Sequence, residues 1–502
     1  MNDAVVLPQP APVRTEHFDV LIVGAGISGI GGAYHLAHQC PGTSFVVLET
    51  KDTFGGTWVT HKFPGIRSDS DLHTFGYRFK PWVGPPIATA AEILKYMGDV
   101  IVENDLAKHI RYCHEIRTAS WSSVDNLWTI EAVRTDTDTG EACRFTANFL
   151  WMCQGYYRHT EGYTPHWDGM HDFKGMIVHP QTWPEDLDYK DKTVLVIGSG
   201  ATAATLIPAM AKDVAHITML QRSPTYFRAG RNAIELAEEL RALQIDEAWI
   251  HEIVRRKILR EQDLFTRRTF TEPETVRKEL IGAVRGLLPP DYDVETHFTP
   301  KYRPWRQRLA FVPDGDLFEG IRSGKASVIT GEIERFVTDG VLLKTGETLK
   351  ADIIVTATGF NLCMMGDIAF TINGMPLNFA DTVTYRGMMF TGVPNLCWVF
   401  GYFRASWTLR ADLVGDFVCR LLKHMHAMGS RRVEVRLRPE DRDMKLLSWI
   451  DEENFNPGYM LRGMHLLPKR GDKPEWSHTQ DYWNEKDWLP AIDLDGNEFV
   501  YG

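Results

Sequence analysis

A glycine-rich loop near the start of the chain has the residue types and spacing that bind a dinucleotide. The segment VGAGISG follows the apolar run at residues 20–23 and places Gly24, Gly26 and Gly29 at GxGxxG spacing before a predicted helix. The first glycine permits a tight turn, the second lets a pyrophosphate approach the backbone, and the third lets the helix pack closely on the strand. The pyrophosphate then faces the N-terminus of the helix.

A second loop of the same kind lies further along the chain. The segment IGSGATAA follows the apolar run at residues 194–197 and contains Gly198, Gly200 and Ala203. One such loop alone is a weak signal, because short glycine patterns also occur by chance. Two of them in one polypeptide predict two bound cofactors, with electrons passing between them.

A carboxylate closes the first nucleotide-binding unit. Residues 17–49 follow the order strand, glycine loop, helix, strand, and Glu49 comes directly after the returning strand at residues 45–48. A carboxylate at this place accepts hydrogen bonds from ribose hydroxyls and repels a 2′-phosphate. The first site is therefore predicted to bind FAD or NAD rather than NADP.

An arginine takes the corresponding place in the second unit. The returning strand at residues 216–220 is followed by Gln221, Arg222 and Ser223, with no acid at its tip. A guanidinium group can bind a 2′-phosphate with two parallel hydrogen bonds. The second site is predicted to bind NADPH, and a solvated surface arginine is the alternative interpretation.

Composition argues against several classes of protein. The 502 residues carry a net charge of -11 with no long Lys/Arg block, which argues against nucleic acid as a main partner. No apolar run is long enough to predict a transmembrane segment, and the N-terminus lacks the features of a signal peptide. The seven scattered cysteines contain no CxxC pair, which favours reduced thiols and a cytoplasmic location. No metal site is predicted, and the oligomeric state, a homo-oligomer included, stays open.

The order of predicted elements indicates an α/β fold with two Rossmann-like dinucleotide-binding domains. An NADPH domain carrying a helical segment is inserted into an FAD domain. A hairpin after residue 331 leads into a buried strand at residues 353–356. The predicted divisions are a flexible leader, 1–16; the first part of the FAD-binding domain, 17–153; the NADPH-binding domain, 154–340, with a helical insertion at 231–290; and the second part of the FAD-binding domain with a C-terminal cap, 341–502.

Two longer patterns are typical of one enzyme family. The pattern FxGxxxHxxxW followed by Pro or Asp is met by Phe173, Gly175, His179, Trp183 and Pro184. The pattern GGxWxxxx[FY]PGxxxD is met by Gly55, Gly56, Trp58, Phe63, Pro64, Gly65 and Asp69. With both nucleotide loops in the family's order, the chain resembles the type I Baeyer-Villiger monooxygenases of the flavin-containing monooxygenase superfamily, close to the subgroup of the ethionamide-activating monooxygenase. The resemblance extends from about residue 18 to the late four-hundreds.

This resemblance implies an FAD enzyme that uses NADPH and O₂ to convert ketones to esters or lactones through a peroxyflavin. Oxidation of sulfides commonly accompanies that activity, so a small-molecule ketone or sulfide is the expected substrate. The peroxyflavin must remain an anion to attack a carbonyl. A fixed positive charge is therefore expected near it, in a site closed to water.

Arg308 is the candidate for this charge. In the family a Lys-Arg pair precedes a short loop with an Asp and a Gly; here Gln307 and Arg308 precede the Asp-Gly of residues 314–315. Arg303 and Arg306 are rivals for the catalytic role, because the length of the loop is open, and Arg303 is second in order.

The glutamine at position 307 departs from the family pattern. The lysine usually found there helps to hold the phosphate of NADPH, and glutamine carries no charge. Either Lys301 or Arg222 alone compensates, or NADPH binds less tightly.

Asp69 is the acid that matches Arg308 in the family pattern. It is expected to orient the arginine and to contact flavin and nicotinamide, with Arg67 and Ser68 facing the same junction; an alternative role is to cap a helix that starts at Ser70 or Asp71. The other residues expected at the FAD site are Gly24, Gly26, Ser28, Gly29, Glu49, Gly56, Thr57, Trp58 and Ile116. Those expected at the NADPH site are Gly198, Ser199, Gly200, Ala201, Thr202, Gln221 and Arg222.

His179 belongs to the first family pattern but is not assigned a catalytic role. It lies in the segment that links the two predicted domains, where the resemblance indicates coupling of domain rotation to the reaction cycle. A single histidine in such a place is more often a hydrogen-bonded part of a hinge.

Three other functions are weighed against ketone oxidation. A flavin monooxygenase acting mainly on sulfides or amines shares the fold, but Trp183 and Pro184 weigh against it. A disulfide reductase requires a CxxC or an equivalent redox pair, and a non-catalytic NADPH-sensing module leaves the FAD pattern unexplained. The substrate itself is open; residues 364–365, 402–407 and 459–466 are plausible pocket lining, although core packing explains them equally well.

Overall fold

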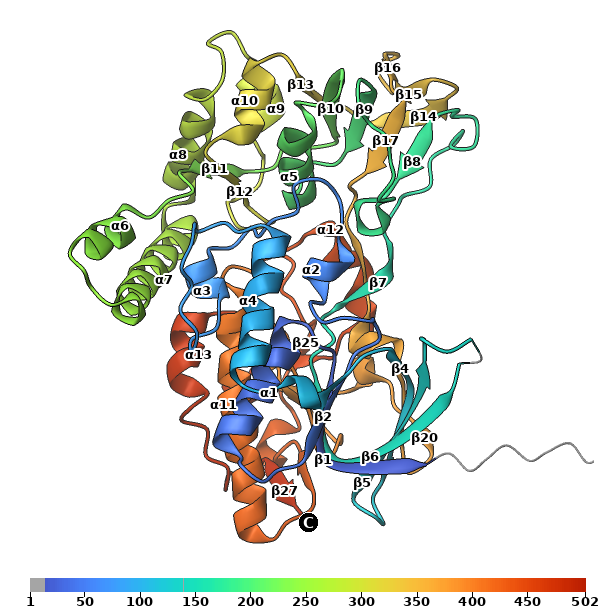
Figure 1. Ribbon diagram of the computed structural model, residues 1–502, viewed down its shortest axis with the longest axis vertical. Helices are drawn as coiled ribbons and strands as arrows, with labels where there is room; N and C mark the ends of the chain where they lie inside the picture. The colour runs from blue at the N-terminus through green and yellow to red at the C-terminus, as the bar shows by residue number, and fades with distance from the viewer. Residues whose placement is uncertain (1–13, 139) are drawn as a thin grey trace, which may run out of the picture.

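The computed structural model describes residues 14–138 and 140–502 (Figure 1). Figure 1 shows two sheet-containing parts, one above the other, with a pair of helices projecting from one side. Most of the predicted leader, residues 1–13, lies outside the described residues. The last residues of the predicted leader are described, and strand β1, Thr15–Val23, begins among them.

The first nucleotide-binding domain is built on a nine-stranded sheet. Strand β1 is an interior strand of this sheet and pairs in parallel with β2 and β6. The apolar run from Val20 to Val23 is buried on both faces, as expected for a central parallel strand. The other strands of this sheet are β2 (Phe45–Leu48), β3 (Ile110–Arg111), β4 (His114–Ser122), β5 (Leu127–Arg134), β6 (Ala142–Met152), β19 (Ala369–Ile372), β20 (Met375–Pro376) and β23 (Leu396–Trp398).

Helices α1, α4 and α11 belong to this domain (Figure 1). Helix α1, Ile27–Gln39, begins directly after the first glycine loop, and α11, Trp407–Met428, packs along it. Helix α4, Ala90–Glu103, starts with a capping box in which Thr89 and Glu92 satisfy each other's backbone N–H groups.

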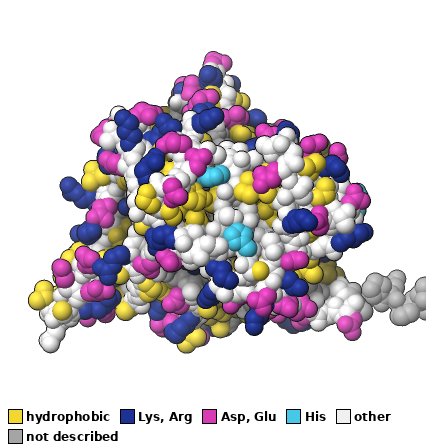
Figure 2. Space-filling view, turned by 90° about the horizontal axis from the view of Figure 1, so that it is seen from above, with side chains coloured by type: hydrophobic (Ala, Val, Ile, Leu, Met, Phe, Trp, Pro, Cys, Tyr) yellow, Lys and Arg dark blue, Asp and Glu magenta, His cyan; other side chains and the backbone are white. Residues whose placement is uncertain are grey.

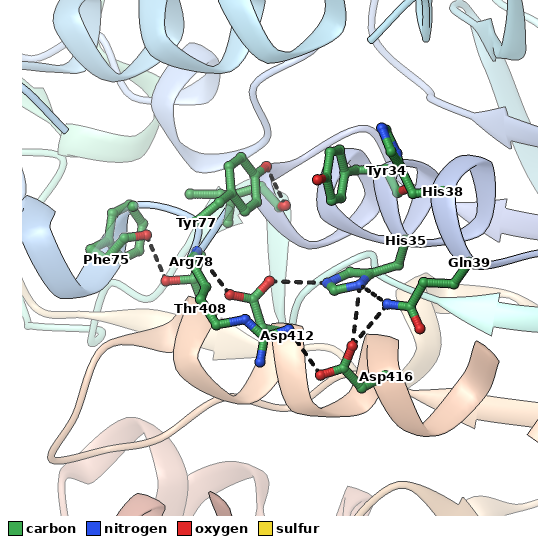
Figure 3. Close-up of polar contacts among 12 residues, drawn as sticks. Tyr34, His35, His38, Gln39, Phe75, Tyr77, Arg78, Thr408, Asp412 and Asp416 are labelled. Atoms are coloured by element: carbon green, nitrogen blue, oxygen red, sulfur yellow. Dashed lines mark hydrogen bonds and ion pairs between the residues drawn. The ribbon is translucent and has the colours of Figure 1, made fainter. Parts of the chain in front are cut away.

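A buried polar network joins α1 to α11 (Figure 3). Nε2 of His35 donates to Oδ1 of Asp412 at 3.1 Å, and Gln39 donates to Oδ1 of Asp416 at 2.8 Å. A Cβ atom added at Gly415 would lie 2.5 Å from the His35 ring, so only glycine lets the two helices approach this closely. The network fixes the position of α1, whose N-terminus is the end that faces the first glycine loop.

The second nucleotide-binding domain has a five-stranded parallel sheet in the order β13-β10-β9-β17-β8. The strands are β8 (Met176–Val178), β9 (Thr193–Ile197), β10 (His216–Gln221), β13 (Ala326–Thr330) and β17 (Ile353–Thr356). Strand β17 lies between β9 and β8, although the predicted division places residues 341–502 in the first domain. The chain therefore returns to the first domain after Thr356.

The segment predicted to be helical, residues 231–290, contains helices α6 (Glu235–Ala242), α7 (Glu247–Thr271) and α8 (Pro273–Arg285). Pro273 occupies the first turn of α8, where its missing N–H costs nothing, and this separates α8 from α7. Helices α6 and α7 form the projecting pair in Figure 1. Arg255 of α7 donates to the backbone carbonyls of His73 and Gly76, which ties the helical segment to the first domain.

The remaining elements complete the two domains, connect them or form the C-terminal cap. Strands β7 (Tyr157–Gly162) and β18 (Phe360–Leu362) pair where the chain passes between the domains. The other helices are α2 (Thr57–Thr60), α3 (Leu72–Phe75), α5 (Ala201–Met210), α9 (Val294–Phe298), α10 (Asp316–Arg322), α12 (Gly458–Gly463) and α13 (Tyr482–Trp488). The other strands are β11 (Phe227–Gly230), β12 (Ala310–Pro313), β14 (Ile333–Val337), β15 (Gly340–Leu343), β16 (Thr348–Lys350), β21 (Thr384–Tyr385), β22 (Met389–Phe390), β24 (Val433–Val435), β25 (Leu446–Leu447), β26 (Arg470–Gly471) and β27 (Phe499–Tyr501).

A buried ion pair holds the C-terminal cap. Nε of Arg410, on α11, donates to Oε2 of Glu485, on α13, at 2.8 Å, and both side chains are almost fully buried. Burial alone would raise the pKa of Glu485, but the charge of Arg410 keeps it below its usual value. The same carboxylate oxygen accepts from the hydroxyl of Tyr402 at 2.7 Å.

The surface seen from above carries acidic and basic side chains interspersed with one another (Figure 2). Among the helices of the described residues, none combines the length and apolarity needed to cross a membrane.

Candidate active site

A cavity of about 1170 Å³ runs between the two glycine loops. It is larger than the roughly 300–1,000 Å³ typical of a site for one small ligand. Its wall contains most of the residues predicted to bind cofactors or to act in catalysis. These are Gly24, Gly26, Ser28, Glu49, Gly56, Thr57, Trp58, Arg67, Asp69, Ile116, Gly198, Ser199, Gly200, Ala201, Thr202, Gln221, Arg222 and Arg308.

Two residues of the predicted set, Gly29 and Ser68, are not part of the cavity wall. A Cβ atom at Gly29 would lie 1.8 Å from the carbonyl oxygen of Gly24, so this glycine permits the close packing of helix on loop. The hydroxyl of Ser68 accepts from the backbone N–H of Ala88 at 3.2 Å. Both support the cavity wall from behind.

The two glycine loops have the shape of phosphate cradles. Gly24 has φ +94° and Gly198 has φ +126°, conformations that glycine adopts without strain. Gly26 and Gly200 directly precede α1 and α5, so the backbone N–H groups of both helix N-termini are directed at the cavity. A Cβ atom at Gly200 would meet no protein atom within 4 Å, which leaves open space for a pyrophosphate.

Glu49 lies at the end of β2 with its carboxylate against the first loop. Its two oxygens accept from the backbone N–H groups of Ala25 at 2.7 Å and Lys51 at 3.0 Å. Burial raises the pKa of Glu49, although these two hydrogen bonds oppose the rise. The geometry fits the predicted ribose contact, because the side chain is held at the cavity wall by the loop itself.

Arg222 lines the second half of the cavity, and no ion pair to it is formed within the described residues. We expect Arg222→Ala to raise the KM for NADPH by about 10- to 100-fold, since a charge-assisted hydrogen bond contributes about 1.5–3 kcal/mol. The KM for NADH should change little, because NADH has no 2′-phosphate. Steady-state kinetics with both coenzymes checks this, and an equal loss with both would contradict the assignment.

Arg308 and Asp69 meet in the cavity although 239 residues separate them. Nη1 of Arg308 donates to Oδ2 of Asp69 at 3.2 Å. Burial alone would lower the pKa of Arg308, but the charge of Asp69 and the neighbouring Tyr459 raise it above its usual value. The guanidinium group is therefore a fixed positive charge at every working pH.

The alternative role of Asp69 as a helix cap is not what the structure shows. Helix α3 begins at Leu72, and its cap is Asp71, whose side chain accepts from the backbone N–H of His73 at 2.8 Å. The carboxylate of Asp69 accepts hydrogen bonds from Arg308 and from the hydroxyl of its neighbour Ser70, the latter at 3.4 Å.

The rival arginines are directed elsewhere. Arg303 donates to the backbone carbonyl of Asn454 at 3.1 Å and lies over the ring of Phe270, with 4.0 Å from Cζ to the ring centroid. Arg306 pairs with Glu453 at 3.0 Å. Neither lines the cavity, nor does Lys301, whereas Gln307 does.

Aromatic side chains complete the wall near Arg308. Tyr156 stacks on Trp407 with ring centroids 5.4 Å apart, and its ring centroid lies 6.3 Å from that of Tyr459. Trp407 and Tyr459 fall within the predicted lining stretches, but Tyr156 carried no signal in the sequence, because it lies in an irregular segment after β6. In the stretch around Met364 and Met365, core packing accounts for the two methionines, since Met365 lies in the core of the first domain and Met364 packs against it. Their neighbours Cys363 and Gly366 line the cavity.

His179 joins the two halves of the connecting segment. Its Nε2 donates to the backbone carbonyl of Gly359 at 3.2 Å, and its Nδ1 accepts from the N–H of Gln181 at 3.1 Å. A Cβ atom at Gly162 would lie 1.9 Å from its ring, so β7 packs directly on the histidine. These contacts fit a hinge element, and His179 is not part of the cavity wall.

Two other histidines, the buried His61 and the half-buried His159, line the cavity and carry no charge at neutral pH. Burial, reinforced by His159 and His179, lowers the pKa of His61 to about 4, and burial with the charge of Lys51 lowers that of His159 to about 4. In the unfolded chain these histidines bind protons below about pH 6.5, whereas in the folded protein they do so only near pH 4. Their contribution to the free energy of unfolding is therefore complete above about pH 6.5 and is lost as pH falls toward 4.

We therefore expect the free energy of unfolding to fall between pH 7.5 and pH 5, by about 2 kcal/mol for each of these two histidines. Urea unfolding at the two pH values measures the fall. The double variant His61→Gln/His159→Gln should show a smaller fall than the parent. An equal fall in both proteins would contradict the assignment to these side chains.

The comparisons with known proteins agree with this geometry. Residues 22–83 match the family model described as NAD(P)-binding Rossmann-like domain, and residues 84–231 match the model described as flavin-binding monooxygenase-like. The FAD-containing monooxygenase EthA of Mycolicibacterium smegmatis is 46% identical over 471 residues, which cover 93% of this chain and 94% of that protein. The chain belongs to the flavin-binding monooxygenase family.

A further relative supports the same placement, and solved structures share the fold. The probable FAD-binding monooxygenase AlmA of an Acinetobacter species is 41% identical over 466 residues, 92% of each chain. An oxidized steroid monooxygenase bound to NADP has a TM-score of 0.76 at 22% identity, over 97% of this chain and 99% of that one. Cyclohexanone monooxygenase from Rhodococcus sp. Phi1 bound to NADP+ has a TM-score of 0.73 at 20% identity, over 97% and 99%.

These findings confirm several predictions from the sequence. The resemblance to the type I Baeyer-Villiger monooxygenase family, close to the EthA group, is confirmed, as is the α/β fold with two dinucleotide-binding domains. The cofactors of this flavin-binding monooxygenase are FAD and NADPH, and a solved structure with the same fold is bound to both FAD and NADP. The enzyme is an oxidoreductase.

Proposed function

We propose that this monooxygenase converts ketones to esters or lactones, with oxidation of sulfides as a side activity. The observation that supports this most is the Arg308 guanidinium, held by Asp69 in the wall of a cavity that both glycine loops share. One ketone, one O₂, one NADPH and one proton give one ester, one NADP+ and one water, so the reaction balances.

The residues divide between the two cofactors. The first loop, Glu49 and the residues Gly56, Thr57 and Trp58 would hold FAD, whereas the second loop, Gln221 and Arg222 would hold NADPH. When bound, NADPH supplies a hydride and FAD supplies the ring that activates O₂.

Arg308 supplies what the ketone reaction requires from the protein. An oxygen atom that adds to a carbonyl carbon acts as a nucleophile, so the site must stabilise negative charge as the bond forms. The guanidinium is charged and its partner Asp69 fixes its direction. The aromatic wall of Tyr156, Trp407 and Tyr459 reduces the access of water, which strengthens this electrostatic effect.

Product analysis tests the proposal. The purified enzyme is incubated with NADPH, ¹⁸O₂ and a panel of linear, cyclic and aryl ketones together with thioethers. We expect esters or lactones that carry one labelled oxygen atom, alongside sulfoxides. Sulfoxides without any ester would instead establish an enzyme that acts on soft nucleophiles.

A further inference from the structure

The arginines of the cavity wall differ in their charge partners. Three of the five are paired with carboxylates: Arg67 with Asp316 at 2.5 Å, Arg158 with Asp367 at 2.8 Å, and Arg308 with Asp69 at 3.2 Å. Arg222 is the predicted contact for the 2′-phosphate of NADPH. That leaves Arg462, which forms no ion pair with any carboxylate of the described residues.

Arg462 is held in place but retains free donors. Its Cζ lies 3.4 Å from the centroid of the Tyr163 ring, and its Nη2 donates to the backbone carbonyl of Phe360 at 3.3 Å. Guanidinium groups have five N–H donors, and this is the one hydrogen bond that the described residues give it. Stacking and a single hydrogen bond orient the group and leave most of its donors for a ligand.

Two glycines border the guanidinium group of Arg462. A Cβ atom at Gly458 would lie 3.2 Å from Nη1, and one at Gly359 would lie 3.8 Å from Nη2. Gly359 has φ +100°, a conformation that disfavours any side chain there. Because Arg462 lines the cavity, an anion bound in the cavity can reach its guanidinium group.

The position of Arg462 associates it with the reacting end of the cavity. Helix α12 lies at the junction of the two domains (Figure 1) and carries Tyr459 three residues before Arg462. Residues spaced by three share a helix face, and both side chains line the cavity. Tyr459 is close enough to Arg308 to influence its pKa, so the unpaired cation shares a helix face with a residue beside the proposed catalytic arginine.

We propose that Arg462 binds the carboxylate of an oxo-acid substrate and makes ketones that carry a carboxylate the preferred substrates. This inference rests on the proposed oxidation of ketones at Arg308. The carboxylate is bound but not transformed, and one oxygen atom enters beside the ketone carbonyl as in the balanced reaction above.

The first experiment compares a linear (ω−1)-oxodecanoate with its methyl ester, using the holoenzyme. The parent enzyme is expected to favour the acid over the ester by about tenfold or more in kcat/KM. Arg462→Gln should abolish this preference while leaving kcat/KM for the ester within about twofold, and Arg462→Lys should retain part of it. The matched control is Arg470→Gln, because Arg470 also bonds a backbone carbonyl, that of Ser448 at 2.9 Å, but does not line the cavity.

A second measurement does not depend on ketone oxidation. Decanoate should inhibit the parent enzyme competitively against whichever substrate it oxidises, ketone or thioether, and methyl decanoate should inhibit it less. Arg462→Gln should weaken inhibition by decanoate about tenfold or more. If only thioethers are oxidised, the proposed function fails while this test of Arg462 still applies.

Three results would overturn the inference. In the first, the parent enzyme shows neither a preference for the acid nor inhibition by decanoate. In the second, Arg462→Gln has normal FAD content and Tm but keeps both the preference and the inhibition. In the third, Arg462→Gln raises the KM for NADPH without changing the ratio of kcat/KM for the acid to kcat/KM for the ester. The last result would assign the cation to the dinucleotide instead.

Discussion

Replacing Arg308 with alanine is expected to lower ester formation by about a thousandfold while bound FAD is still reduced by NADPH. A unit charge at about 4 Å contributes about 4 kcal/mol at an effective dielectric constant near 20, and this corresponds to about three powers of ten in rate. Hydride transfer requires no such stabilisation of negative charge on the oxygen that attacks the ketone. NADPH oxidation in the variant should therefore release hydrogen peroxide in place of product.

Stopped-flow reduction, peroxide assay and product analysis separate these steps. Arg308→Lys keeps a positive charge and should recover part of the ester yield. Arg303→Ala is the matched control, since Arg303 bonds the carbonyl of Asn454 outside the cavity wall. Ester formation that survives Arg308→Ala but not Arg303→Ala would transfer the catalytic role to Arg303.

Local motifs explain how much of the cavity could be predicted from the sequence. The two glycine loops, Glu49 and Arg222 sit at fixed offsets from strands that are themselves recognisable as short apolar runs. Because the ends of neighbouring parallel strands meet at one edge of a sheet, the residues of each unit had to lie together at the edge of their own sheet. The structure brings both edges to one cavity, whose wall contains Glu49, Arg222 and the loop glycines except Gly29, whose missing side chain serves packing.

Residues outside such motifs could not be placed in this way. Arg303, Arg306 and Arg308 lie in one irregular segment, where spacing does not tell which side chain faces inward. Their directions depend on partners far away in the sequence, Asn454, Glu453 and Asp69. Only the assembled fold separates the cavity arginine from its neighbours.

The same limit applies to the domain boundaries and to the lining of the pocket. Strand β17 reads as a buried apolar run that fits either sheet, and its pairing with β9 and β8 is decided by tertiary contacts. Met364 and Met365 have the composition of pocket lining, yet they face the core. Composition is the same for a pocket wall and a core, so it does not distinguish them.

The cap should depend strongly on the buried pair of Arg410 and Glu485. We expect Glu485→Ala to lower the free energy of unfolding by about 3–5 kcal/mol, because it leaves a buried guanidinium without its counter-charge. Urea unfolding or a shift in Tm measures the loss. Tyr402 is a residue of the cavity wall, and its hydroxyl loses its acceptor in this variant. Substrate turnover should therefore fall even at temperatures below the unfolding transition.

Two controls show whether burial of the charge causes the loss. The exposed pair of Arg231 and Glu235, at 2.7 Å, is matched in chemistry but not in burial, and Glu235→Ala should cost at most about 1 kcal/mol. The double variant Arg410→Met/Glu485→Leu should be more stable than Glu485→Ala, since it removes both charges and leaves apolar side chains in their place. If the double variant is instead the less stable of the two, the unpaired charge is not the main cause of the instability. The hydrogen bonds from Arg410 to the backbone carbonyls of Arg386 and Phe400 would then matter more than the ion pair.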